Sequence, residues 1–389
     1  MQQAVAIAAV SEMRPSRYPD YDDMEMYRQV MIKFLQDWNV HPHDIQGVMA
    51  APAGMAGGGS AEIFTHEKLY DELGLHPRFS ETINAGGATY SIMVQRAALA
   101  IAEGLADSIL CIGAGKFPRV GAGGAEQMAK MISHAEFEYI YGPAIYAIYA
   151  QAATRHMYEY GTTREQLAQV AVSARKWALK HPDAFMRSKG EITVKDVLSS
   201  RPIAWPFNML DCSVPCEGGG ALLVTTDEIA RRINAQPAYI LGMGEYHTHG
   251  YISQAPSLTT QGARFSGEQA FRRANLSPAD IDVVEIYDAF TINPLIYLED
   301  LGFCPKGEGG KFVQEGHTEP GGDLPLNTYG GLLSFGHVGD ASGMSMLVEG
   351  ALQVMGRAGE RQVRARTALV HSYGGMMAEH ATLILGRQL

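Results

Sequence analysis

The chain has 389 residues, of which 46% are hydrophobic and 19% charged. This length corresponds to about two to three domains and excludes a small scaffold, and the composition excludes disordered and fibrous classes. The net charge of -11 argues against nucleic-acid binding, because neutralising phosphates needs a basic surface. Four cysteines without a Cys-x-x-Cys pair predict no disulfide framework and no metal site. Since we find no basic leader and no long apolar run, we expect a soluble cytoplasmic protein without membrane contact.

Short β-rich runs alternate with helical patterns, which indicates an α/β protein with helix-covered sheets. In the first half, the pattern predicts strands at 4–10, 47–51 and 108–112 and helices at 24–38 and 86–104. The stretch from about 113 to 207 is less regular and contains a helix-start signal at 162–165, so we expect a large excursion from the sheet. A strand at 221–226 follows, and then a short helix capped by Asp227.

From residue 238 the pattern restarts, with strands at 239–244 and 283–286, a helix at 267–274 and a last strand at 381–385. The final strands of the two halves are similar, which suggests a duplicated unit. We therefore predict an N-terminal half at 1–230, with the excursion at 113–207, and a C-terminal half at 231–389.

Three parts of the sequence combine glycine turns with polar residues that a core does not require. They are Asn84-Ala-Gly-Gly-Ala-Thr-Tyr90; Glu285-Ile-Tyr-Asp-Ala-Phe-Thr291 with Leu298-Glu-Asp-Leu-Gly-Phe-Cys304 after it; and Asn327-Thr-Tyr-Gly-Gly-Leu-Leu-Ser-Phe-Gly-His337 with Ser372-Tyr-Gly-Gly375 further on.

In their order and spacing, these motifs resemble the thiolase superfamily, specifically its sterol-carrier-protein and archaeal-type branch, over nearly the whole chain. The resemblance implies an α/β thiolase fold, in which two similar halves, each with a five-stranded sheet, form α-β-α-β-α layers. It also implies that the excursion covers an acyl-CoA site.

The sequence departs from this family at both catalytic cysteines. The family's nucleophile falls at Gly87, and the His-Asp pair before the second cysteine is replaced by Tyr287-Asp288-Ala289. The family's histidine is kept as His337. Without a thiolate, the acyl-enzyme that thiolysis requires cannot form at Gly87.

A retro-aldol cleavage of a 3-hydroxyacyl-CoA needs only a base for the β-hydroxyl and donors for the thioester oxygen. Tyr287 and His337 are the candidates for these roles. Thiolase-like relatives in steroid side-chain degradation lack the cysteine and act as aldolases with a small zinc-ribbon/OB-fold partner, so the resemblance implies an enzyme that makes or breaks a carbon-carbon bond next to a CoA thioester. Retro-aldol cleavage is preferred over retro-Claisen cleavage of a 3-ketoacyl-CoA. The alternative is a non-catalytic scaffold subunit in a multi-subunit acyltransferase or thiolase complex.

The remaining candidates have a structural and a functional interpretation. Asp288 is a site candidate whose other role is to cap the next helix. Gly87 and Gly374 are expected to bring backbone N–H groups to a thioester oxygen. The expected substrate-binding residues are Asn84, Gly86, Tyr246, His247, Tyr373 and Gly375.

Beyond the chain itself, we expect coenzyme A only as part of the substrate and no tightly bound cofactor. We also expect a homodimer or a heterotetramer that pairs through the strand near 108–112, because an unpaired strand edge favours association.

Overall fold

The computed structural model describes residues 4–52, 64–116, 124–142 and 144–388. Its strands are β1 (Val5–Glu12), β2 (Gly47–Ala50), β3 (Phe79–Thr82), β4 (Ser108–Gly115), β5 (Pro202–Ala204), β6 (Phe207–Asn208), β7 (Gly218–Thr226), β8 (Ala238–His247), β9 (Val283–Ile286), β10 (Thr367–Gly374) and β11 (Glu379–Gly386). Its helices are α1 (Asp23–Asp37), α2 (Thr65–Glu72), α3 (Thr89–Ala102), α4 (Gly124–Ile132), α5 (Ile145–Tyr160), α6 (Arg164–Ala178), α7 (Val194–Ser199), α8 (Asp227–Ile233), α9 (Ala263–Ala274), α10 (Ile292–Asp300), α11 (Gly309–Gln314) and α12 (Ser342–Met355).

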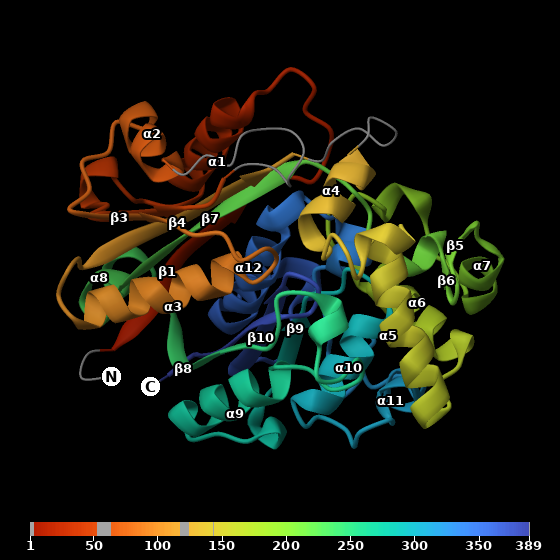
Figure 1. Cartoon of the computed structure of the whole chain (residues 1–389). Coiled ribbons are helices and arrows are strands. Elements are labelled where there is room, and N and C mark those ends of the chain that lie inside the picture. The colour runs from red at the N-terminus through yellow and green to blue at the C-terminus, as the bar shows by residue number, and fades with distance from the viewer. Residues whose placement is uncertain (1–3, 53–63, 117–123, 143, 389) are drawn as a thin grey trace.

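The main strands lie in the order β3-β2-β4-β7-β1-β8-β11-β10-β9. The two halves meet where β1 pairs with β8 over only two residue pairs. Figure 1 shows α1 and α2 outside the first set of strands, α3 and α12 between the two sets, and α9 and α10 outside the second set. The expected layered α/β architecture is confirmed. The second half contributes four strands instead of five, and Leu326 adds only an isolated bridge to Val284. The division near residue 230 stays a prediction.

The middle helices α3 and α12 are buried on nearly all sides. They contact strands of both halves, so neither helix keeps a solvent-facing stripe. This explains why their sequences are almost continuously apolar and do not show the usual amphipathic pattern.

The strand expected to form the oligomer edge is an interior strand. β4 pairs with β2 on one side and with β7 on the other, so its backbone groups are already used. The open edge of the first half is β3. The sequence predicted the strand but could not reveal its neighbours, which are distant along the chain.

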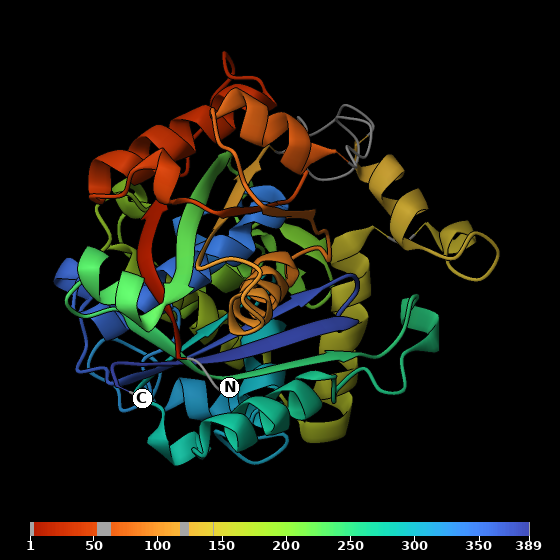
Figure 2. The same ribbon diagram turned by 90° about the vertical axis from the view of Figure 1, so that its left-hand side faces the viewer.

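The chain between β4 and β7 contains α4 to α7 and the hairpin β5-β6. Thr163 begins α6 with a reciprocal cap, since its Oγ1 accepts from the Gln166 N–H at 3.3 Å and its own N–H donates to the Gln166 side chain at 3.0 Å. Figure 2 shows residues 124–142, in gold, projecting from the body of the molecule. Among the described helices, none has the length and hydropathy required to cross a membrane.

Candidate active site

Two glycine turns meet at the start of α3. A side chain at Gly374 would collide with the carbonyl oxygen of Ala85, so the two backbones approach each other more closely than any other residue would permit. Gly86 has a φ of +57°, a value that glycine adopts without strain. The turn 84–88 and the end of β10 therefore form one rigid corner of the site.

Tyr287 and His337 reach this corner from two other segments. Tyr287 follows β9, whose parallel neighbour β10 ends at the same edge of the sheet. His337 follows the π-helical turn Gly331–Phe335. The Tyr287 hydroxyl lies 2.9 Å from His337 Nε2, within hydrogen-bonding distance. The structure thus joins two residues that are 50 positions apart in the sequence.

Ser213 is the third member of this hydrogen-bonded chain. Its Oγ lies 3.1 Å from His337 Nδ1, on the side of the ring opposite Tyr287. Its segment is tied to the site by backbone bonds: the Ser213 N–H donates to Ala289 O at 2.9 Å, and the His337 N–H donates to Val214 O at 2.7 Å. Ser213 was not among the expected site residues, because its partner lies 124 positions away and local sequence gives no signal of such a pairing.

The two ring nitrogens of His337 are thus both engaged. The expected role of His337 as a direct donor to a substrate oxygen requires one of these bonds to break. The arrangement instead favours a relay, in which His337 accepts from Tyr287 at Nε2 and donates from Nδ1 to Ser213.

Gly87 lies directly against Tyr287. A Cβ atom at Gly87 would be 2.6 Å from the Tyr287 ring and 2.5 Å from the Tyr373 carbonyl oxygen, closer than side-chain carbons pack. The ring of Tyr287 therefore occupies the space that a side chain at position 87 would need. Gly87 and Tyr287 therefore depend on each other, because only a glycine at position 87 leaves room for the tyrosine ring.

The electrostatics of the site follow from burial. Desolvation lowers the pKa of the His337 imidazole to about 4, so the ring is neutral near pH 7. Desolvation also raises the pKa of the Asp288 carboxyl to about 8, since that residue is fully buried. Both groups are therefore mainly uncharged at neutral pH.

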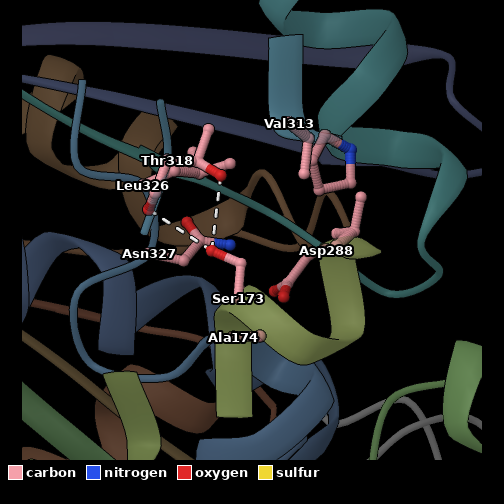
Figure 3. Close-up of a pocket in the computed structure, with 9 residues that line it drawn as sticks. Ser173, Ala174, Asp288, Val313, Thr318, Leu326 and Asn327 are labelled. Carbon is pink, nitrogen blue, oxygen red and sulfur yellow. Dashed lines mark hydrogen bonds between the residues drawn. The ribbon is translucent and has the colours of Figure 1, made fainter. Parts of the chain in front are cut away.

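Asp288 contacts the turn that precedes His337. Its Oδ1 accepts from the Leu332 N–H at 2.7 Å, within that π-helical turn. Figure 3 shows Asp288 beside Ser173, Thr318 and Asn327, which line the same cavity of about 10 Å³. Asp288 therefore supports the segment before His337 and does not cap the following helix.

Aromatic rings form the wall next to Tyr287. Tyr373 packs edge-on against Tyr287, with ring centroids 5.1 Å apart. Tyr149, from α5, stacks on Phe290 at 4.6 Å and lies 6.1 Å from Tyr373. Tyr373 was expected at the site, and Phe290 lies within the motif at 285–291 although no role was expected for it. Tyr149 was not expected, because nothing in the local sequence distinguishes it from other core aromatics.

Three expected substrate-binding residues have other partners. Asn84 accepts from the Gly86 N–H at 3.1 Å and so stabilises its own turn. Tyr246 stacks on Phe265 at 4.4 Å. His247 is exposed and hydrogen-bonds to Glu245 and Glu379. These contacts are all with residues other than Tyr287 and His337.

The four cysteines are free, and none is activated. Burial raises the pKa of Cys212, Cys216 and Cys304 to about 12, and it raises the pKa of Cys111 as well. A thiolate nucleophile is therefore not favoured at any of them near pH 7.

Comparisons with known proteins identify the family of this chain. Residues 244–387 match the family model of the thiolase C-terminal domain. The chain is 32% identical to an acetyl-CoA acetyltransferase of Methanothermobacter thermautotrophicus over 98% of this chain and 99% of that protein. It is also 32% identical to a steroid side-chain-cleaving aldolase of Thermomonospora curvata over 89% of each.

Among solved structures, the chain resembles the Ltp2-ChsH2(DUF35) aldolase with a TM-score of 0.86 and 29% identity, covering 99% of this chain and 98% of that one. The fold, the order of the glycine turns and these full-length similarities establish that the chain belongs to the thiolase superfamily, in the branch that includes archaeal acetyl-CoA acetyltransferases and side-chain-cleaving aldolases.

Proposed function

We propose that this protein cleaves or forms a carbon-carbon bond next to a CoA thioester without a cysteine nucleophile, by retro-aldol chemistry on a 3-hydroxyacyl-CoA. The proposal rests on the position of the Tyr287 hydroxyl. This group lies 2.9 Å from Nε2 of a neutral His337, and the Tyr287 ring packs against Gly87. The aldolase names among the similar proteins support the same chemistry.

In the cleavage direction, the substrate's β-hydroxyl gives its proton to the Tyr287 oxygen while the Tyr287 proton moves to His337 Nε2. The Cα–Cβ bond breaks, Cβ becomes a carbonyl carbon, and the electron pair moves to Cα and the thioester oxygen as an enolate. Return of the proton through Tyr287 to Cα gives the shorter acyl-CoA. No oxidant or second substrate is needed.

The enolate oxygen needs donors that are already in place. We assign this role to the backbone N–H groups of Gly87 and Gly374, next to the N-termini of α3 and α12, since the Gly86 N–H already donates to Asn84. A helix N-terminus carries partial positive charge, and one such donor is typically worth about 2.7 to 4 kcal/mol of transition-state stabilisation.

The acyl-CoA substrate requires a path to this corner. A groove of about 630 Å³ runs along α5, lined mainly by apolar groups that include Ala150, Trp205 and Leu258. Tyr149 extends from the opposite face of α5 and belongs to the aromatic wall of the site, so α5 lies between the groove and that wall. We assign this groove to the CoA thioester, which enters as a substrate and not as a resident cofactor.

A partner subunit is a second element of the proposal. The projecting segment 124–142 exposes Met131, Phe137, Ile140 and Tyr141, and apolar groups gathered on a projection are typical of an association surface. The name of the similar aldolase structure joins two components, Ltp2 and ChsH2(DUF35). This supports a heteromeric assembly, with a zinc-ribbon/OB-fold protein as the expected partner. The same observation favours the second candidate function, a scaffold whose partner carries the activity.

The test compares the purified chain, alone and with the product of a neighbouring gene, on 3-hydroxyacyl-CoA and 3-ketoacyl-CoA substrates. We expect a carbonyl product and a shortened acyl-CoA from the hydroxy substrate only. Cleavage of only the 3-ketoacyl-CoA would favour the retro-Claisen alternative. Activity of the complex that survives changes at both Tyr287 and His337 would favour the scaffold.

A further inference from the structure

A second cleft lies outside the proposed reaction site. It encloses about 670 Å³ between the end of β1, the C-terminal parts of α1 and α12, and the turn that follows α6. Neither Tyr287 nor His337 nor Ser213 lines it. Its size is within the range of small-molecule sites, about 300 to 1,000 Å³.

Three arginines with unused donors line this cleft. Arg361 is buried and donates hydrogen bonds from Nη2 and Nε to the Glu349 carboxylate, at 2.8 and 3.1 Å. Its Nη1 forms no hydrogen bond to the described residues. Arg357 lies over the Trp38 ring at 4.6 Å. The guanidinium groups of Arg14 and Arg357 form no hydrogen bond or ion pair within the described part of the chain.

The acidic side chains of the cleft are largely neutralised. Asp37 is bound by Lys33 at 2.8 Å and by the Ser11 hydroxyl at 2.6 Å. Glu349 is paired with Arg361. Burial raises the pKa of Glu12 to about 8, so its carboxyl is mainly uncharged near pH 7. Asp183 is the remaining acidic side chain, and the lining also holds four cationic side chains, Arg14, Lys33, Arg357 and Arg361. With Glu12 mainly uncharged, the cleft carries more positive than negative groups.

We propose that this cleft binds a small organic anion, with Arg14, Arg357 and Arg361 holding its phosphate or carboxylate group. Guanidinium groups bind both kinds of anion through paired, charge-assisted hydrogen bonds. The Arg357 guanidinium, already stacked on Trp38, provides a flat surface beside the anion. This site is independent of the proposed reaction, because its residues are separate from the Tyr287 relay.

The experiment titrates the full-length protein with inorganic phosphate and, separately, with succinate, each against sodium chloride of equal ionic strength, by isothermal titration calorimetry. The test variant is Arg14→Gln with Arg357→Gln, which removes the guanidinium groups of two exposed arginines. Arg361 is left unchanged, because its loss would leave Glu349 buried without a partner. The matched control, Arg232→Gln with Arg272→Gln, removes two exposed arginines from α8 and α9.

We expect saturable binding of at least one anion, weakened about 100-fold in the test variant and unchanged in the control. Whether phosphate or succinate binds more tightly distinguishes a phosphate ester from a carboxylate as the natural ligand. The proposal is overturned if neither anion binds beyond the sodium chloride background, if the test variant binds as the unchanged protein does, or if both double variants lose binding equally.

Discussion

Replacing Tyr287 by phenylalanine tests the proposed chemistry most directly. The change removes one oxygen and keeps the ring that packs against Tyr373 and Gly87. On the retro-aldol mechanism it removes the group that takes the β-hydroxyl proton, and such acid-base groups contribute about 100- to 10,000-fold in rate. At about 1.36 kcal/mol per tenfold, the expected loss of transition-state stabilisation is about 2.7 to 5.4 kcal/mol.

The folded state should lose much less. Tyr287→Phe breaks one hydrogen bond, to His337 Nε2, which is worth about 1 kcal/mol of stability. We would measure kcat and KM for cleavage of a 3-hydroxyacyl-CoA by product formation, and the free energy of unfolding by urea denaturation. Tyr329→Phe is the matched control, because Tyr329 is also a buried tyrosine and its hydroxyl has no hydrogen-bond partner among the described residues.

The mechanism predicts that kcat falls sharply in Tyr287→Phe and stays unchanged in Tyr329→Phe, with both proteins folded. If Tyr287→Phe keeps full activity while His337→Ala abolishes it, the assignment of Tyr287 as the base is wrong. If neither change affects the assembled complex, the chain is a scaffold.

Four further outcomes follow from the structure. Because burial lowers the pKa of His337 to about 4, the pH–rate profile should fall only as the pH approaches that value; a loss centred near the ordinary histidine pKa of about 6.5 would contradict the neutral ring. The pKa of Asp288 is about 8 in the fold and about 4 in the unfolded chain. Between these pH values the folded state holds one more proton, so the free energy of unfolding should decrease as the pH rises. Asp288→Asn should flatten this pH dependence in urea unfolding, and an unchanged pH dependence would refute the burial argument. Incubation of the unchanged protein, or of Gly87→Cys, with acyl-CoA should give no acyl adduct in intact-mass spectra, because a Cβ at 87 meets the Tyr287 ring; an adduct in either protein would reveal a usable nucleophile. Light scattering at micromolar concentration should give the mass of a dimer or larger assembly, and a monomer would count against self-association. The contact surface is expected at the open edge strand β3 and not at the interior strand β4.

The sequence alone determined the local features of this protein. Strands such as β7 and β9 and helices such as α1 follow from hydrophobic period and capping residues, which depend only on near neighbours. The glycines at 86, 87 and 374 were identified in the same way, since a glycine turn between a strand and a helix is visible in the chain itself. The absence of a nucleophile at Gly87 was inferred from the resemblance to the thiolase superfamily, which places the family's cysteine at that position.

Only the tertiary structure decided which of these features meet. Ser213 entered the site through its contact with His337, 124 residues away, and local sequence carries no information on such pairings. Tyr246 and His247 resembled pocket residues, yet β8 places them beside Phe265 and Glu379. Asp288 is completely buried by packing from distant segments, and this burial raises the pKa of its carboxyl. In this position it accepts from the Leu332 N–H and stabilises the turn before His337.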